Sequence, residues 1–434
     1  MSPLAKKKFD YKWVIVGCCF AMMAVSMGFC SSTKQLFVEP VTAVLGIKRG
    51  VYALNTTFRY ITNALVNLMF GTLLAKLGVR KMIMVGFSAL IACNVLFATA
   101  QNVFMIYGGG MLLGFGLAMC GSTTISYIIH ARFQGGNVGT VMGFTLAANG
   151  FGGAIALKVL DPIIGNYQKN PDGWRNAYWL IALLIAIVGA LILILYREKK
   201  DGYTPPAKKQ KKARGNTWDG LTFAEAKKKP YFLLTMLCLF LTGFVLAGIN
   251  GISLVHMKAS VVTESNQAFI VSVWAFHSLA LMFSKFLMGF LYDKCGLRIA
   301  FFICQGTAVL VMIALSLVEN STFGLVMGVI YAIFSSLALP METVGVSLAV
   351  GDIFGSRDYA RILGLMTAVM SVGFAVGDPI MNAIYDWRGT YVDAIRIAVV
   401  AIAFVSVGFQ IVIKTAYKDR EKILAERAAA EPIV

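Results

Sequence analysis

Charged residues are scarce in this sequence. They make up 14% of the 434 residues, whereas hydrophobic residues make up 58%, and the mean hydropathy is +0.74. Soluble domains are about half apolar and about a quarter charged. The composition therefore excludes a water-soluble globular fold and predicts a protein with several membrane-spanning segments.

The scarcity of histidine and the absence of enzyme motifs narrow the possible functions of the protein. Histidine occurs only three times, and the eight cysteines lie singly, without the spacing of a zinc site. The sequence has no nucleotide-binding motif and no nucleophile spaced with a base, so we expect no enzyme, cofactor or metal site. Acidic residues (21) are outnumbered by Lys and Arg (39), but the positive charge lies between apolar runs. This position indicates membrane topology and contact with anionic lipids, not nucleic acid.

Twelve long apolar runs are present. Each has about 20 residues or more, enough to cross a hydrocarbon core of about 30 Å. The runs are too continuous for the strands of a membrane barrel, which alternate in hydrophobicity. We therefore predict an all-α membrane protein with spans near 13–37, 51–75, 81–99, 104–128, 138–160, 176–196, 232–256, 267–291, 299–318, 322–348, 361–383 and 392–413.

The distribution of Lys and Arg predicts the orientation. Basic residues gather at the N-terminus, after spans two and eight, and in the tail, whereas the links after spans three and nine have none. Both termini are therefore expected in the cytoplasm. The apolar run after the basic N-terminus is too long for a signal-peptide core, so we expect the first span to be retained.

A basic hydrophilic stretch divides the chain. We predict a six-helix bundle over 1–196, a basic cytoplasmic linker over 197–230, and a second six-helix bundle with a short cytoplasmic tail over 231–434. The linker is interpreted as a flexible connector held near anionic lipid, with a partner-binding or regulatory segment as the alternative. Its end, LTFAEAKKKP, is compatible with a short amphipathic helix that leads into span seven.

Two turns repeat half a chain apart. GTLLAKLGVRK (71–81) and GFLYDKCGLRI (289–299) share the pattern Gly-x-x-x-x-Lys-x-Gly-x-Arg at an offset of 218 residues, which implies two related halves. Glycine permits a tight turn and a close helix approach. The second copy adds Asp293, a carboxylate suited to a helix N-terminus, where the first copy has Ala75.

These turns resemble the signature loop of the major facilitator superfamily. The resemblance implies twelve helices in two pseudo-symmetric halves, a monomer, and transport by alternating access. It also implies a gating role for the signature residues Gly71, Gly78, Arg80, Gly289, Asp293, Gly296 and Arg298. Because Ala75 replaces the acid, one of the two contacts that hold the outward-open state in this family is expected to be missing.

Further stretches resemble the branch of oxalate:formate antiporters and monocarboxylate transporters. They are GWRNAY (173–178), GDIFGSRDYARILG (351–364) and DPI (378–380). Span eight also contains the branch pattern Ser-Arg-x-x-x-Gly, with Lys285 in place of the arginine. The span-eleven lysine of the oxalate exchanger is absent, which argues against oxalate exchange specifically.

Two cations stand inside the predicted spans. Lys285 lies about 12 Å along the helix from Asp293, and Arg59 shares a polar helix face with Asn55, Thr62, Asn63 and Asn67. Charges inside a membrane are rare and indicate function. We interpret both cations as ligands of an anion in a central cavity. The alternatives are an ion pair of Lys285 with Glu342, and polar contacts between helices for Arg59.

Other residues are candidates for the same site. Tyr60, Asn63, Asn149, His277 and Tyr331 are expected to shape the cavity, and the repeat offset places His277 level with Arg59. Glu342, Asp378 and His277 are candidates for proton coupling or for structural ion pairs. Lys34 is expected either to reach the membrane interface or to line the outer vestibule, and Pro340 is expected to kink span ten.

The sequence thus predicts a multi-pass cell-membrane transporter of a small organic anion, a monocarboxylate or related carboxylate. Both proton symport and anion exchange are compatible with it. An efflux carrier for hydrophobic drugs is the main alternative, and a membrane sensor on the same scaffold is a third. The expected partners are the anion, protons as a coupling ion, and anionic lipids.

Overall fold

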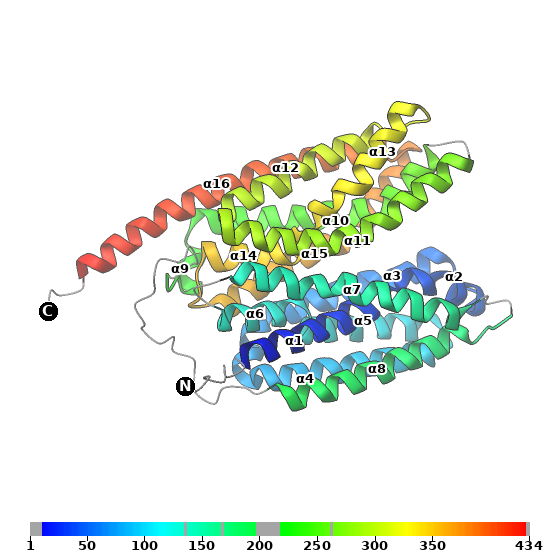
Figure 1. The fold of residues 1–434 in the computed structure, drawn as a ribbon, viewed down its shortest axis with the longest axis horizontal. Helices are drawn as coiled ribbons and strands as arrows, with labels where there is room; N and C mark the ends of the chain where they lie inside the picture. The colour runs from blue at the N-terminus through cyan, green and yellow to red at the C-terminus, as the bar shows by residue number, and fades with distance from the viewer. Residues whose placement is uncertain (1–10, 134–136, 166–168, 197–217, 261–263, 431–434) are drawn as a thin grey trace, which may run out of the picture.

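The computed structural model describes residues 11–133, 137–165, 169–196, 218–260 and 264–430. The described part is helical, and its helices form two bundles that lie side by side (Figure 1). The N-terminal half contains α1 (Tyr11–Met23), η1 (Ala24–Phe29), α2 (Lys34–Leu45), α3 (Arg49–Leu68), α4 (Phe70–Ala98), α5 (Val103–Cys120), α6 (Ser122–Arg132), α7 (Val138–Ile164) and α8 (Gly173–Leu195).

The C-terminal half follows the same plan after the short helix α9 (Phe223–Lys227). It contains α10 (Pro230–Ala259), α11 (Glu264–Cys295), α12 (Leu297–Ser316), α13 (Thr322–Phe334), η2 (Ser335–Leu337), η3 (Leu339–Glu342), α14 (Val344–Ile353), α15 (Tyr359–Arg388) and α16 (Val392–Ala430). Helix α1 begins and α16 ends at the same end of the molecule, here named the termini side (Figure 1).

The predicted spans correspond to these helices. Within the described residues, ten stretches are long and apolar enough to cross a membrane. Helices α3 and α11, which match predicted spans two and eight, complete the twelve. Helix α3 is less apolar than the ten because Asn55, Arg59, Asn63 and Asn67 occupy one of its faces. The all-α fold in two six-helix halves is confirmed, and the cytoplasmic position of the termini remains a prediction from charge.

Several of the spans are interrupted, and three breaks bear on the site. The first passes through the π-helical segment η1 and a turn before α2 begins at Lys34. The fourth breaks at Gly121, between α5 and α6. The tenth passes through η2 and η3 around Pro340, which lacks a backbone N–H, as the sequence indicated. Interrupted helices in membrane transporters occur where protein or a cavity surrounds the backbone.

The two repeated turns have the same backbone conformation. Gly78 has φ 73° and ψ 164°, and Gly296 has φ 82° and ψ 170°. This region of φ and ψ is essentially restricted to glycine. The need for glycine in both copies therefore comes from the sharp turn between consecutive spans.

Part of the linker packs on the C-terminal half. Residues 197–217 lie outside the described residues, so the prediction of a flexible connector falls there. Trp218 and Leu221 are buried, and the Leu221 N–H donates to the Phe354 carbonyl at 2.8 Å.

The predicted amphipathic helix is present as α9. The Thr222 hydroxyl accepts from the Glu225 N–H, and the Glu225 carboxylate accepts from the Thr222 N–H. This reciprocal pair is a capping box, which starts a helix even of this short length.

Candidate functional site

The two halves meet along several pairs of helices, and at two of them repeated glycines lie in the contact. A methyl group built on Gly289 of α11 would lie 2.0 Å from the carbonyl oxygen of Gly139 on α7. A methyl group built on Gly71 of α4 would lie 2.9 Å from the Cα of Arg361 on α15. The repeated glycines thus permit backbone contact between the halves at pseudo-symmetric positions.

Asp293 links the halves on the termini side. Its Oδ1 accepts from the Gly139 N–H at 2.9 Å, and its Oδ2 accepts from the Thr140 N–H at 2.6 Å. Both donors belong to the first turn of α7, where free N–H groups and the helix dipole favour a carboxylate. This is the geometry suggested for the signature aspartate, and its role in gating remains a prediction.

Further contacts close the termini side. The Ser347 hydroxyl of α14 donates to the Ser126 hydroxyl of α6 at 2.7 Å. The His130 ring of α6 stacks on the Tyr359 ring of α15, with centroids 4.0 Å apart. These two contacts join opposite halves near the ends of the helices.

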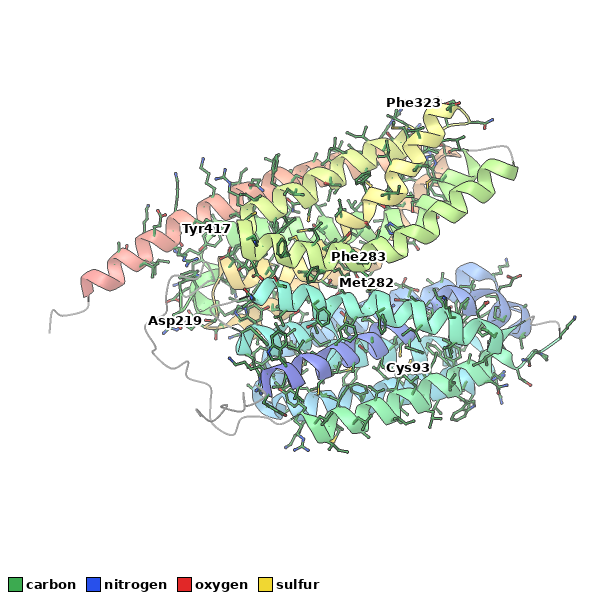
Figure 2. The ribbon with its side chains drawn as sticks, in the orientation of Figure 1. Cys93, Asp219, Met282, Phe283, Phe323 and Tyr417 are labelled. Atoms are coloured by element: carbon green, nitrogen blue, oxygen red, sulfur yellow. The ribbon has the colours of Figure 1, made fainter. Side chains whose placement is uncertain are left out.

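A second level of contacts lies near the middle of the helices. The rings of Tyr60 and Phe374 stack across the halves with centroids 5.2 Å apart, and the Ser371 hydroxyl donates to Asn63 Oδ1 at 3.0 Å. Met282 lies on the side of α11 that faces the N-terminal bundle (Figure 2). From there to the opposite end the two bundles diverge (Figure 1).

Arg59 is a buried cation of the N-terminal half. Its side chain is 6% exposed, and its guanidinium lies 5.0 Å from the centre of the Tyr60 ring. Within the described residues, no ion pair joins Arg59 to a carboxylate within 4 Å. The cation–π contact stabilises the guanidinium but leaves its charge unneutralised.

Lys285 is the buried cation of the C-terminal half. It is 2% exposed, and its own backbone carbonyl packs against Gly143 of α7. Glu342 is the acid that interacts with it electrostatically. Across the described parts of the chain, no ion pair within 4 Å involves Lys285, so the predicted alternative of a close pair with Glu342 is not formed in this conformation.

Lys34 and Asp378 belong to the same charged cluster. The Lys34 ammonium donates to the Thr56 hydroxyl and interacts electrostatically with Arg59 and with Asp378 of the opposite half. Asp378 Oδ1 accepts from the Asn382 amide at 3.0 Å. The position of Lys34 at the start of α2 follows from the interruption of span one.

Tyr60 connects the charged residues of the two halves, because it interacts electrostatically with Arg59, Glu342 and Asp378. The structure therefore brings together most of the charged residues that the sequence singled out. We name the five charged members the central cluster: Lys34, Arg59, Lys285, Glu342 and Asp378.

The predicted polar residues have protein partners. Asn63 donates to the Gly114 carbonyl at 3.2 Å and accepts from Asn67 and Ser371. Asn149 Oδ1 accepts from the Ser32 hydroxyl at 2.9 Å. These bonds hold the amides in place near the interface between the halves.

His277 and Tyr331 lie elsewhere. Together with Asn250 and Ser335 they line a small cavity inside the C-terminal half. The His277 Nδ1 lies 3.1 Å from the Ala332 carbonyl and 3.1 Å from the Ser335 hydroxyl, both within the C-terminal half. The structure does not bring this pair into the central cluster.

Sequence reasoning missed the partners across the halves. Ser371 and Phe374 lie in an apolar run without polar periodicity, and Ser126 and Ser347 carry no motif. Tyr359 lies in the quoted stretch 351–364, but nothing there indicates a partner in the other half.

Two bundles of membrane-spanning helices with buried charges are typical of a membrane transporter. A model of the Major Facilitator Superfamily matches residues 14–260 and 235–433. The chain belongs to this superfamily, and it is a transporter rather than an enzyme, as the sequence predicted.

Known proteins agree with this assignment. The chain is 21% identical to the uncharacterized MFS-type transporter YcxA of Bacillus subtilis (strain 168), over 95% of this chain and 96% of the relative. Its fold resembles the transporter FucP in the outward conformation, with TM-score 0.70 and 14% identity over 92% of this chain and 98% of FucP. It also resembles the proton:xylose symporter XylE, with TM-score 0.71 and 13% identity over 93% and 96%. These structural likenesses show the fold alone.

Proposed function

We propose that this transporter carries a small organic monoanion, a monocarboxylate or related carboxylate, between its two halves. The observation that supports the proposal is the pair of buried cations, Arg59 and Lys285, which come from opposite halves and have no carboxylate within 4 Å among the described residues. A carboxylate cargo would supply the missing negative charge and would contact both halves at once.

The charge of the central cluster favours a monoanion. Its three cations stand against two acids, Glu342 and Asp378, which leaves one unbalanced positive charge when both acids are ionised. One carboxylate neutralises the cluster, whereas a neutral sugar does not. FucP and XylE are similar in fold, and their cargo is not transferred to this chain.

Alternating access follows from the contacts between the halves. With the termini side closed by Asp293, His130 and Ser347, a cargo reaches the central cluster from the opposite end. Transport then requires these contacts to break while new ones form at the opposite end. Both proton symport and anion exchange are compatible with this cycle, with Glu342 and Asp378 as the acids that would carry a proton.

Uptake into proteoliposomes tests the proposal. A panel of carboxylates, neutral sugars and lipophilic cations is offered to wild type, Arg59→Gln and Lys285→Gln. Losing a charge-assisted hydrogen bond costs about 1.5–3 kcal/mol, so each variant should take up the anion at least about tenfold more slowly. Lys158→Gln, which changes an exposed lysine of α7, is the matched control.

Normal anion uptake by both variants contradicts the proposal. Selective transport of lipophilic cations would instead support the efflux carrier, with Glu342 and Asp378 as ligands.

A further inference from the structure

His130 occupies the contact that closes the termini side. It lies near the end of α6, and its ring stacks on Tyr359 of the opposite half with an interplanar angle of 14°. A methyl group built on Gly351 of α14 would lie 2.7 Å from its Cε1. The imidazole is therefore packed between two elements of the other half.

One nitrogen of the half-buried His130 ring has no partner. Its Nε2 is inaccessible to solvent and has no hydrogen-bond partner. A neutral imidazole can leave an acceptor nitrogen unpaired at moderate cost, but an imidazolium presents two N–H donors and a full charge. Burying a charge without a partner costs far more than burying a neutral polar group.

Among the described residues near His130, the two carboxylates Asp352 and Asp358 are already engaged by other groups. Asp352 of α14 accepts from the Tyr417 hydroxyl at 2.5 Å and pairs with Arg420 at 3.8 Å. Asp358, before α15, accepts from the Phe223 N–H at 2.7 Å. Figure 2 shows Tyr417 at this end of the molecule.

The other ionisable groups near this end are basic, phenolic or thiol groups. Helix α6 itself carries Tyr127 and Arg132, and Arg132 lies over the Tyr196 ring. The titratable groups of the described elements packed against α6, besides the two acids above, are Tyr11, Lys12, Cys18 and Cys19 on α1, Tyr107 and Cys120 on α5, Lys158 and Asp161 on α7, and Tyr359, Arg361, Asp378, Tyr385, Asp386 and Arg388 on α15. Of these, the groups at the opposite end of their helices are Tyr107, Lys158, Asp161, Asp378, Tyr385, Asp386 and Arg388. Charging His130 would thus add a cation near other cations.

We propose that His130 is a proton-sensitive element of the gate on the termini side, and that its protonation opens this gate. The proton binds the open arrangement in preference to the closed one, because opening separates the ring from Tyr359 and Gly351 and lets water solvate the imidazolium. A ligand that prefers one of two states shifts the population toward that state. Acidification of the termini side, which the charge pattern assigns to the cytoplasm, therefore favours the open gate.

The expected size follows from proton linkage. A solvated imidazole titrates near pH 6.5. If the closed gate excludes the proton, the ratio of open to closed molecules rises about tenfold between pH 7.5 and pH 5.5. The proposal concerns regulation and is independent of the cargo.

Hydrogen–deuterium exchange of the full-length protein in lipid nanodiscs tests it. Labelling times are scaled for the intrinsic pH dependence of exchange, and the peptides read are those covering 122–132 and 344–353. Wild type should show the tenfold rise in opening. His130→Phe keeps a flat ring and His130→Gln keeps a polar group, and both should remove the pH dependence. His130→Lys should open the gate already at pH 7.5.

His256→Phe is the matched control, because His256 lies in the C-terminal half, against the Leu315 carbonyl. It should retain the wild-type pH response. The proposal is overturned if wild type opens no more at pH 5.5 than at pH 7.5, or if both uncharged variants still respond as wild type does. The proposal is also overturned if His256→Phe loses the pH response while the His130 variants keep it. If His130→Phe does not fold, the pH response of His130→Gln provides the test.

Discussion

Placing a cation in the middle of a membrane helix costs free energy, and Arg59 and Lys285 are two such cations. Insertion scales place the cost at about 2.5–3.5 kcal/mol for each. Arg59 has a ring beside it and Lys285 has Glu342 in electrostatic range, but neither forms a close ion pair in the described residues. Structural pairs would offset this cost permanently, so their absence favours a mobile anion as the complement.

The charge balance predicts the effect of removing an acid. Glu342→Gln raises the unbalanced charge of the central cluster from one to two, so carboxylates should bind at least several-fold more tightly and a dicarboxylate should become a ligand. Isothermal calorimetry with one monocarboxylate and one dicarboxylate measures both effects. Glu319→Gln, an exposed acid outside the cluster, should bind as wild type does. If Glu342→Gln binds both carboxylates with the wild-type affinity, Glu342 is not part of the binding site.

At the level of elements, the turn glycines differ in what they tolerate. Gly78 has ψ 164°, in a region essentially closed to other residues, whereas Gly46 ends α2 in the left-handed helical region with φ 64° and ψ 29°. Asparagine adopts the second conformation readily but not the first.

Gly78→Asn should therefore destabilise the protein by about 1–3 kcal/mol, whereas Gly46→Asn should change stability little. Thermal unfolding in detergent measures the difference. Gly296→Asn should match Gly78→Asn, because the two turns share one conformation. Equal melting temperatures for Gly46→Asn and Gly78→Asn would contradict this account of the repeat.

The elements could be predicted from the sequence to different extents. The order of the spans was visible because the thickness of the bilayer sets the length of each apolar run. The break at Pro340 was visible because proline cannot continue the ladder. The π-helical segment Ala24–Phe29 could not be predicted from the sequence. It lies where the backbone of Gly28 packs on the backbone of Gly152 of α7, and no residue pattern within the segment indicates it.

At the scale of the whole molecule, the site was predictable only within each half. The polar face of α3 follows from helical periodicity, so Arg59 and Asn63 could be placed on one side. Their partners Phe374 and Ser371 depend on how two rigid bundles pack, which periodicity does not encode. The same limit explains why His277 was expected to shape the central cavity but lines a cavity of its own half.

On the termini side, the contact of the signature aspartate with a helix start is present in only one of its two copies, at Asp293. Asp293→Ala removes two hydrogen bonds to the first turn of α7, each to a charged acceptor and together worth several kcal/mol at most. The closed state should lose stability, and amide exchange over 138–145 should rise at least about tenfold. Lys294→Ala changes the exposed neighbour and should leave exchange there unchanged. Equal exchange in the two variants would show that Asp293 does not hold the halves.

The first copy of the repeat lacks this contact, and the lack can be repaired. The offset of 218 residues aligns Ala75 with Asp293, and from this symmetry we expect residue 75 to face the start of α15 as Asp293 faces α7. That helix start receives no side-chain cap, because the Asp358 carboxylate is used by the Phe223 N–H. Ala75→Asp should add a favourable helix-dipole contact of about 0.3–1 kcal/mol, which lowers opening about two- to fivefold. Amide hydrogen exchange of residues 359–364 measures this opening, and Ala75→Asn is the uncharged control. Faster exchange in Ala75→Asp would mean that the alanine avoids a clash or a repulsion, and that the asymmetry is not a missing latch.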